Sequence, residues 1–457
     1  MEFHAKAGSG GGEGGAGPVS PAEAVAALHQ EYDNILGYIA ARDAVVADTA
    51  MRGFGCDHEM LVKIVCNRSK PQIDAIDKVY RALPKNTSHT SFNDAVKSET
   101  SGNYGKFMTY VTQKRGDFLA KQLHKAMDGF GCNKKLLNAC FTSSTSEDIQ
   151  AMQEFYENQH SKKLADVIRS ELGGEHEKLI LFLLKNGRPE DPGDPGQAEA
   201  QKAELKEMIK KGGTMMGGLK DAAEEQVSKY IAAMSAHQCQ EVAKVWNGFE
   251  KTIKDKFGGA LEEAVLQLME ESENLQAQQL EAAMKGLGTD EETLSRVLGG
   301  NQKHTAAIIS AKYFEKYDKA LADSLKSEIG GNYLNAVLTW IAGNDASGGM
   351  EPTVLFYRKK FNAGTLSSAE MEQYADILTS AIDNCKDCVA SLDADLLKKA
   401  TRGLGTDERM VVSIMCNRTK AQLDAVDLVY RERYGRTLRE YCERELGGDL
   451  KEFLVYT

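Results

Sequence analysis

The apolar residues of this chain recur every three to four positions, which is the period of an amphipathic helix. Two such helix faces follow each other early in the chain: Leu61, Ile64 and Val65, then Ile73, Ile76, Val79 and Tyr80. The longest apolar run, Leu179–Leu184, is far shorter than the ~18 residues of a membrane-spanning helix, and we expect it to be the end of a core helix. Only 8 prolines interrupt the chain, so the pattern predicts an all-α protein.

The helical pattern is also repeated. Cys66–Arg81 and Cys416–Arg431 carry apolar residues at the same positions, and the differences between them conserve size. This similarity indicates a duplicated unit of roughly 70 residues, and such units share a hydrophobic core with their neighbours.

Four copies of a glycine loop are each followed by a distant glutamate. One Gly-x-Gly is more often an ordinary turn between helices than a metal site. However, the glutamate follows the second glycine by 44 residues in the first copy and by 40 residues in the other three. The pairs are Met51–Cys56 with Glu99, Met127–Cys132 with Glu171, Met284–Thr289 with Glu328, and Thr401–Thr406 with Glu445.

A further, degenerate unit is expected between the second and third loops, because Gly131 and Gly288 are 157 residues apart, about two repeats. Within this gap, Lys256 stands where the other units have glutamate, and Lys211–Lys220 keeps glycines without the loop order. Gly288 and Gly405 are 117 residues apart, which places an insertion before the last unit.

These spacings predict five helical repeats. Each contains a first helix, the glycine loop, a second helix, a polar turn, a third helix and two more helices, with the glutamate near the end of the fourth. The predicted boundaries are a glycine-rich disordered tail at 1–20, repeats at 21–115, 116–187, 188–272 (degenerate), 273–344 and 389–457, and an insertion at 345–388.

The loops and glutamates suit calcium, which takes six to eight oxygen ligands in irregular geometry. Glycine lets successive carbonyls of a tight loop converge, and the glutamate adds charge. A glutamate in the last turn of a helix opposes the helix dipole, which suggests a nearby cation. One carboxylate per site predicts weak affinity, ~10⁻⁴ to 10⁻³ M, unless lipid phosphate completes the shell. The candidate ligands are Met51, Gly53, Gly55, Glu99, Met127, Gly129, Gly131, Glu171, Met284, Gly286, Gly288, Glu328, Thr401, Gly403, Gly405 and Glu445.

The composition of the chain limits the classes of partner that it can bind. The net charge of −11 argues against nucleic acid and against unaided binding to anionic lipid, so a bridging cation is needed. Nine cysteines and no export signal indicate reduced thiols and a cytoplasmic protein, peripheral on membranes when calcium is raised. No histidine grouping suggests an enzyme. Cys385 and Cys388 lack the partners of a zinc or thioredoxin-like site, so we interpret them as incidental.

The motif Met284–Glu291 followed by Lys326–Gly331 closely resembles the endonexin-type calcium motif of annexins, and Thr401–Glu408 with Glu445 is nearly as close. The resemblance covers most of 21–457 outside the insertion. It implies a curved disc of five-helix repeats whose convex face binds anionic phospholipid through calcium held by three loop carbonyls and the downstream acid.

The chain departs from the annexin pattern in several places. It has a fifth repeat and an insertion, which puts the geometry of the disc in question. Cys56 and Cys132 replace threonine, and Asp128 stands where the other loops are basic. The first repeat carries about four extra residues around Pro84–His89.

Two questions remain open at this level. The apolar residues Phe54, Phe130, Leu287 and Leu404 in the middle of the loops either enter the lipid interface or pack on their own repeat. The main alternative function is a scaffold in which annexin-like repeats bind cytoskeletal proteins. Arg68 and Arg418 are interpreted as internal ion-pair or helix-capping residues.

Overall fold

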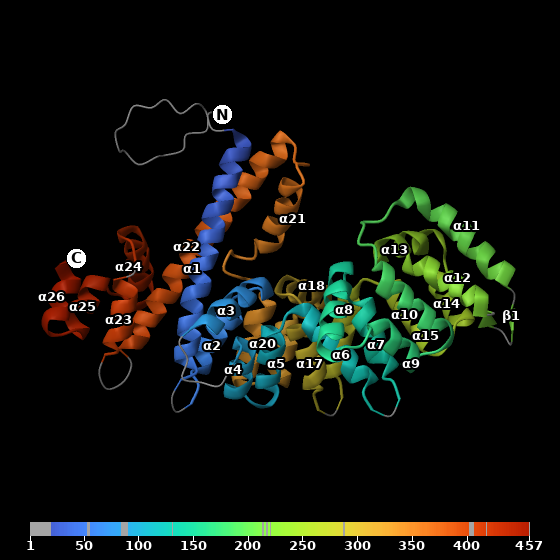
Figure 1. The fold of residues 1–457 in the computed structure, drawn as a ribbon, viewed down its shortest axis with the longest axis horizontal. Coiled ribbons are helices and arrows are strands. Elements are labelled where there is room, and N and C mark those ends of the chain that lie inside the picture. Colours follow the sequence, from blue (N-terminus) through green and yellow to red (C-terminus); the bar gives the residue numbers. More distant parts are fainter. Residues whose placement is uncertain are drawn as a thin grey trace. The chain divides into compact units, whose positions relative to one another are not determined.

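The computed structural model describes residues 20–456, except 53, 54, 84–89, 130, 213, 216, 217, 220, 287, 402–405 and 417. Nearly all regular structure in this part is helical, which confirms the predicted all-α class; the exceptions are two antiparallel two-residue strands, β1 (Thr214–Met215) and β2 (Gly218–Leu219). The chain forms two compact units (Figure 1). Unit 2 is Ala40–Asp345, and unit 1 combines the residues up to Ile39 with those from Ala346 onward.

Unit 2 contains four groups of five helices, called repeats 1 to 4 below. Repeat 1 has the part of α1 (Pro21–Ala50) that starts at Ala40, α2 (His58–Val65), α3 (Lys70–Ala82), α4 (Phe92–Glu99) and α5 (Gly102–Thr112). Repeat 2 has α6 (Arg115–Met127), α7 (Lys134–Thr142), α8 (Ser146–His160), α9 (Leu164–Glu171) and α10 (Gly174–Asn186). The run Leu179–Leu184 lies within α10.

Repeat 3 has α11 (Pro195–Gly212), then the two strands, α12 (Asp221–Ala232), α13 (Ala236–Val245), α14 (Phe249–Lys256) and α15 (Gly259–Leu268). Repeat 4 has α16 (Ser272–Met284), α17 (Glu291–Gly300), α18 (Lys303–Tyr317), α19 (Leu321–Glu328) and α20 (Gly331–Ile341). The degenerate repeat therefore has the same five helices as the others, with a short hairpin between its first and second helices.

The four repeats of unit 2 associate in two pairs, each by the same reciprocal exchange. In the first pair, α2 of repeat 1 packs on α20 of repeat 4, and α5 of repeat 1 packs on α17 of repeat 4. In the second, α7 packs on α15 and α10 packs on α12. The second and fifth helices of one repeat thus cover the fifth and second helices of its partner.

Hydrogen bonds cross both pairs. The ammonium of Lys303 donates to the carbonyl of Cys66, and the hydroxyl of Tyr110 donates to Glu292 at 3.0 Å. In the second pair, the Asn138 amide donates to the carbonyl of Ala260 at 2.9 Å. Buried polar groups are satisfied across the seams, so the pairing is specific as well as apolar.

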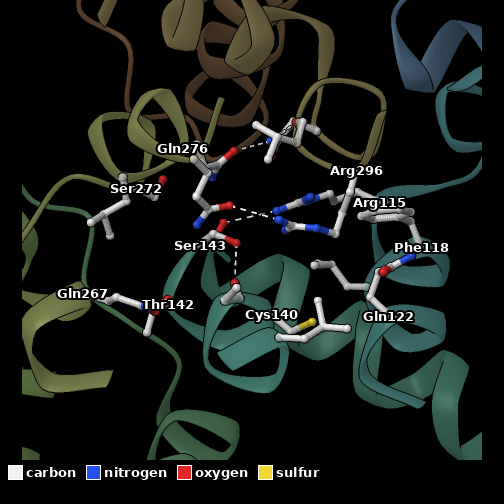
Figure 2. Close-up of a pocket in the computed structure, with 17 residues that line it drawn as sticks. Arg115, Phe118, Gln122, Cys140, Thr142, Ser143, Gln267, Ser272, Gln276 and Arg296 are labelled. Atoms are coloured by element: carbon white, nitrogen blue, oxygen red, sulfur yellow. Dashed lines mark hydrogen bonds between the residues drawn. The ribbon is translucent and has the colours of Figure 1, made fainter. Parts of the chain in front are cut away.

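Arg115 and Arg296 line a pocket within unit 2 (Figure 2). The guanidinium of Arg115 donates to the carbonyl of Gly300 at 3.0 Å and to that of Ser143 at 3.2 Å, and so joins repeat 2 to repeat 4. Arg296 donates to Gln279 at 3.1 Å, and burial lowers the pKa of its guanidinium. The bond from Arg115 to Gly300 therefore links two repeats, whereas the bond from Arg296 to Gln279 joins two helices of repeat 4.

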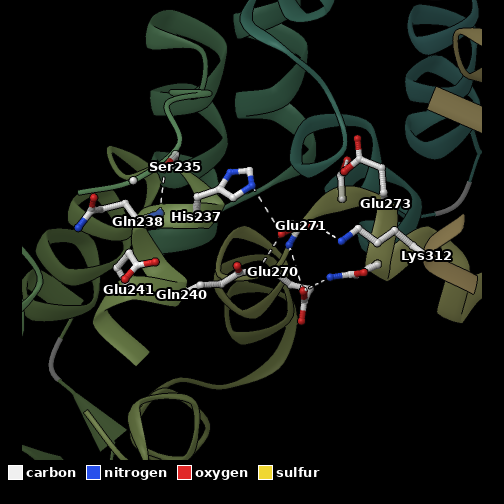
Figure 3. Close-up of polar contacts among 12 residues, drawn as sticks. Ser235, His237, Gln238, Gln240, Glu241, Glu270, Glu271, Glu273 and Lys312 are labelled. Atoms are coloured by element: carbon white, nitrogen blue, oxygen red, sulfur yellow. Dashed lines mark hydrogen bonds and ion pairs between the residues drawn. The ribbon is translucent and has the colours of Figure 1, made fainter. Parts of the chain in front are cut away.

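A second polar junction joins repeats 3 and 4 at Glu271, the residue before α16 (Figure 3). Its carboxylate lies 3.2 Å from the ammonium of Lys312 and 3.6 Å from the imidazole of His237. Gln240 donates to the same carboxylate at 3.4 Å. One acidic side chain therefore links α13 of repeat 3 to α18 of repeat 4.

Unit 1 has two parts. Its first core is formed by the start of α1, by α21 (Glu351–Asn362) and by the first half of α22 (Ser368–Ala400). The buried residues of this core include Val25, Tyr32, Val354, Tyr374, Leu378, Ile382 and Cys385. Arg358 pairs with Asp33 at 2.7 Å. The segment expected to be an insertion is thus packed against the N-terminal half of α1.

Repeat 5 forms the rest of unit 1, from residue 389 in α22 through α23 (Glu408–Met415), α24 (Lys420–Tyr434), α25 (Leu438–Glu445) and α26 (Gly448–Tyr456). The expected boundary between insertion and repeat falls inside the continuous helix α22. In the same way, the long helix α1 belongs partly to unit 1 and partly to repeat 1.

The two arginines singled out in the sequence lie at equivalent places in repeats 1 and 5. Arg68 pairs with Asp43 at 2.6 Å, and Arg418 pairs with Asp393 at 2.7 Å. Both carboxylates are completely buried. The interpretation of these arginines as internal ion-pair residues is confirmed.

All nine cysteines lie among the described residues and are free thiols. Cys385 is buried in the core of unit 1, and Cys388 lies one helical turn further along α22. In the described part of the chain, no helix combines the length and the hydropathy that crossing a membrane requires.

Candidate calcium sites at the glycine loops

The loop glycines that the structure describes have positive φ angles, which other residues avoid. The φ angles are +93° at Gly55, +108° at Gly129, +88° at Gly131, +120° at Gly286 and +91° at Gly288. A Cβ atom added at any of these five glycines would meet nothing within 4 Å. Backbone strain, not lack of space, therefore explains why glycine occupies these positions.

Each loop ends in the same way at the start of the second helix. The amides of Asp57, Asn133, Asp290 and Asp407 donate to the carbonyls of Ala50, Ala126, Ala283 and Ala400, at 2.8, 2.7, 2.8 and 2.8 Å. The side chain of the same Asp or Asn then caps α2, α7, α17 or α23 by accepting a backbone amide. Four loops closed by one pattern are four copies of one structural element.

These capping residues are functional positions that the sequence argument missed. The signal was present, because Asp or Asn follows the last loop residue, Cys or Thr, in all four copies. A capped second helix places the start of that helix at a constant distance from the loop. The capping residues therefore help to hold the loop conformation.

All four candidate glutamates are the last residue of their fourth helix. Glu99 ends α4, Glu171 ends α9, Glu328 ends α19 and Glu445 ends α25. Each side chain is partly buried. In the described residues no lysine or arginine forms an ion pair with Glu99, Glu171 or Glu328. Three carboxylates thus lie at the negative end of a helix dipole without a protein cation to balance them.

In repeat 4 the structure brings the loop and the glutamate together. The hydroxyl of Thr289, in the loop, donates to Oε2 of Glu328 at 2.6 Å. The residues Met284, Gly286 and Gly288 precede this threonine in the same loop. One carboxylate oxygen is occupied by the threonine, and the other remains available to a metal ion.

In repeats 2 and 5 other contacts indicate that the glutamate lies near its loop. In repeat 2, burial and then the charge of Glu171 raise the pKa of the Cys132 thiol, so the glutamate lies close to the loop that contains Met127, Gly129 and Gly131. In repeat 5, Thr406 donates to the backbone carbonyl of Glu445 at 2.8 Å.

The surroundings of Glu445 and of the loop in repeat 1 differ from those in repeat 4. The carboxylate of Glu445 lies 3.7 Å from Arg444 and 4.0 Å from Arg436. In repeat 1, the loop residue Arg52 pairs with Asp48 at 2.5 Å, and Met51 is buried. The arginines of repeat 5 partly neutralise the acid that its site would use.

Repeat 3 has the opposite charge at this place. Its fourth helix, α14, ends at Lys256, where the other repeats have glutamate, as the sequence indicated. The segment between its first two helices contains the paired strands, with Thr214 opposite Leu219. Repeat 3 therefore lacks the acidic donor that the other four repeats have.

Some of the predicted positions cannot be placed. Gly53, Gly403 and Gly405 lie outside the described residues, as do Phe54, Phe130, Leu287 and Leu404 and the extra segment Pro84–His89. The glycine-rich tail is outside them up to residue 19. Of the predicted ligands, Met51, Gly55 and Thr401 are described without their neighbouring glycines.

The predicted donor set of loop carbonyls and one carboxylate fits calcium better than zinc. Among the described residues, no group of three or more His, Cys, Asp or Glu side chains could hold a metal ion. Zinc requires such side chains, whereas calcium accepts backbone carbonyls with one carboxylate. The helix ends that flank the loops of repeats 1, 2 and 4 lie along one edge of unit 2, the lower edge in Figure 1.

Comparison with known proteins identifies these repeats. The model of the Annexin family matches residues 42–111, 118–183, 276–340 and 392–456, which together are more than half of the chain. These segments are repeats 1, 2, 4 and 5. The segment left unmatched between the second and third of them contains repeat 3.

Individual relatives agree with this match. Mouse annexin A6 is 25% identical over 428 residues, which is 91% of this chain and 61% of the relative. Human annexin A13 is 27% identical over 310 residues, covering 67% of this chain and 96% of the relative. The chain thus spans less than two thirds of the length of annexin A6.

Solved structures show the same fold. Annexin III matches with a TM-score of 0.58 and 26% identity, over 67% of this chain and 94% of that structure. A calcium-bound annexin, (Sm)1, matches with a TM-score of 0.56 and 21% identity, over 66% of this chain and 90% of that one. Annexins in general bind phospholipid in a calcium-dependent manner. With four repeats matched by the family model and the fold shared, this chain belongs to the annexin family.

Proposed function

We propose that this protein binds calcium at the glycine loops of repeats 1, 2, 4 and 5 and thereby attaches to anionic phospholipid membranes. The ligands in repeat 4 are the carbonyls of Met284, Gly286 and Gly288 with the carboxylate of Glu328. The matching positions in the other repeats are Met51, Gly53, Gly55 and Glu99; Met127, Gly129, Gly131 and Glu171; and Thr401, Gly403, Gly405 and Glu445. No catalytic step is part of this function.

The observation that carries the proposal is the contact between Thr289 and Glu328 at 2.6 Å. These residues are 39 positions apart in the sequence, yet the fold brings the acid to the loop. The described loop glycines of the same repeat have positive φ angles, which allow successive carbonyls of a tight loop to converge. A loop of this kind beside a single acid is a weak calcium site.

Bound calcium would supply positive charge between this acidic chain and an acidic lipid surface. The chain carries a net charge of −11, so without the metal both surfaces repel each other. Several weak sites on one edge of unit 2 also act together, because the first contact raises the effective concentration of the rest. We therefore place the protein in the cytoplasm, moving to membranes when calcium rises.

Co-sedimentation with vesicles tests the proposal. The full chain should pellet with phosphatidylserine vesicles in calcium, and should stay in solution with phosphatidylcholine vesicles or with a chelator. Glu328→Gln combined with Glu445→Gln keeps size and hydrogen bonding but removes two charges. We expect this double variant to need roughly tenfold more calcium for half-maximal binding.

Lys256→Gln is the matched control, since it changes the residue at the same place in repeat 3, which is not a proposed site. Its calcium requirement should equal that of the unaltered chain. An unchanged requirement in the double glutamine variant would contradict the ligand assignment. Pelleting with filaments in the absence of calcium would instead support the cytoskeletal scaffold.

A further inference from the structure

Among the described residues, unit 1 contains a single repeat, repeat 5, and its second helix is built like that of repeat 1. The second helix of repeat 1, α2, carries Val62 and Val65 and is followed by Cys66; α23 of repeat 5 carries Val412 and Met415 and is followed by Cys416. These residues are spaced by three and four positions, so they lie on one side of the helix. This side, with Leu454 of α26, is called the lateral face of repeat 5.

The two lateral sides differ in burial although their residues correspond. Val62, Val65 and Cys66 are 1%, 0% and 0% exposed. Val412 and Met415 are only partly buried, and Cys416 is exposed. Met108, which contacts Cys66 through sulfur at 3.7 Å, is completely buried, whereas Leu454 in the corresponding position of α26 is partly buried.

The inner side of the same helices shows no such difference. Leu61 and Ile64 are completely buried in repeat 1, and their counterparts Val411 and Ile414 are buried in repeat 5. Repeat 5 is therefore folded like repeat 1 around its own core. The difference includes the side that α20 of repeat 4 covers in repeat 1. It extends to the start of the third helix, where Ile73 is buried and Leu423 is only partly buried.

A buried lysine marks the same seam. Lys303 at the start of α18 in repeat 4 is 2% exposed and crosses to the carbonyl of Cys66 in repeat 1. Lys70 begins α3 in the equivalent way and is 4% exposed. Lys420 begins α24 of repeat 5 and is exposed. Lys70 donates to carbonyls of its own repeat, so only Lys303 crosses the seam, and the apolar side is the feature that repeat 5 shares with the paired repeats.

We propose that the lateral face of repeat 5 binds the lateral face of repeat 5 in a second copy of this chain. The four repeats of unit 2 already cover one another in pairs, so unit 2 offers no free partner in the described structure. Each of those pairs exchanges its second and fifth helices reciprocally. When two identical repeats are related by a two-fold axis, the same surface of each repeat contacts the other. The reciprocal pairing seen in unit 2 is therefore compatible with a symmetric dimer of repeat 5.

Sedimentation velocity of the full chain in a calcium chelator tests this dimer, and the chelator keeps the test independent of calcium binding. From about 1 to 100 µM the chain should pass from monomer to dimer. Met415→Lys places a charge in the seam and should raise the dimer dissociation constant at least about tenfold. Because Met415 is partly exposed, the variant should keep the circular dichroism of the unaltered chain.

Leu428→Lys is the matched control. Leu428 is 55% exposed on α24, and its counterpart in repeat 1 is Lys78, whose side chain stays 73% exposed although repeat 1 is paired. This variant should form dimers like the unaltered chain. Cys416 should also react with a maleimide more slowly as protein concentration rises. A chain that stays monomeric throughout, or a dimer that Met415→Lys leaves intact, would overturn the proposal.

Discussion

Repeats 1 and 5 have closely similar sequences but different surroundings. Both begin with the end of a long helix, both have a capped second helix, and both bury an arginine against an aspartate of the first helix. In repeat 1 a neighbouring repeat covers the lateral side of the second helix, and in repeat 5 the corresponding side is partly open to solvent. A repeat therefore folds around its own inner face and depends on a neighbour to cover its outer one.

The largest expected difference between the two repeats concerns their buried ion pairs. Asp43→Ala leaves Arg68, which is 2% exposed, without its carboxylate, and should lower the free energy of unfolding of unit 2 by about 3–5 kcal/mol. Both tryptophans, Trp246 and Trp340, lie in unit 2. A denaturant titration followed by tryptophan fluorescence therefore reports on this unit.

Asp393→Ala is the matched variant in repeat 5. It should leave the tryptophan transition within ~0.5 kcal/mol of its original position, because repeat 5 contains no tryptophan, and should change only the circular dichroism transition. A tryptophan transition that does not respond to Asp43→Ala would show that repeat 1 does not depend on this pair.

The thiol of Cys416 in repeat 5 should react with a maleimide more than about 100 times faster than the thiol of Cys66 in repeat 1. Burial raises the pKa of the Cys66 thiol to about 12, so almost no reactive thiolate forms at neutral pH. Cys416 is exposed. A brief maleimide pulse on the dilute native chain, with peptide mass spectrometry, should find label on Cys416 and almost none on Cys66. Denatured chain should label both equally, and equal labelling of the native chain would contradict the burial difference.

Replacing the lysines that begin the third helices should produce a smaller difference in the free energy of unfolding between the two repeats. Lys70 donates to the carbonyls of Tyr110, Val111 and Gln113 at 2.8, 3.1 and 2.9 Å. Lys70→Met leaves these buried acceptors without a donor and should cost about 1–3 kcal/mol in the tryptophan transition. Lys420→Met changes an exposed residue and should cost less than ~0.5 kcal/mol in dilute chain. Equal losses would mean that Lys420 is already buried.

The smallest expected effect depends on pH. In the folded chain, burial raises the pKa of the Cys66 thiol from 9.0 to about 12. As pH rises, the thiol therefore loses its proton in the unfolded chain before it does so in the folded chain. The stabilising contribution of the neutral thiol is therefore complete below about pH 9 and is lost as pH rises toward 12. At pH 10 the loss should be about 1 kcal/mol. Cys66→Ala should remove this part of the alkaline destabilisation of unit 2, and Cys416→Ala should not. Identical alkaline losses in the two variants would contradict the assignment.

Much of the fold could be predicted from the sequence because the relevant signals are local. Apolar spacing predicted the helices, and repetition predicted that Lys256 would replace the glutamate at the end of the fourth helix of repeat 3. The left-handed angles at Gly55, Gly129 and Gly288 follow from the glycine pattern itself. The degenerate repeat was visible from the spacing of the loops, and Arg68 and Arg418 were interpreted as internal ion-pair or helix-capping residues.

The site was predictable only in part. The sequence placed Glu328 in the same unit as its loop but could not show that Thr289 would hold one of its oxygens. It also did not indicate that the carboxylate of Glu445 would lie 3.7 Å from Arg444, its neighbour in α25, and 4.0 Å from Arg436 in the turn before that helix, because side-chain conformations depend on the folded surroundings. The boundary at 388 failed to mark a structural break, since α22 continues through it with no helix-ending residue.

By itself, the sequence determined the helical class, the repeat and the positions of the loop glycines, because periodicity, glycine and spacing act within one repeat. Only the tertiary structure decided which repeats pair, that α1 is divided between two units, and that repeat 5 keeps an uncovered side. The physical reason is that burial depends on neighbours: Val62 and Cys66 are core residues because another repeat packs on them, whereas the corresponding Val412 is only partly buried and Cys416 is exposed.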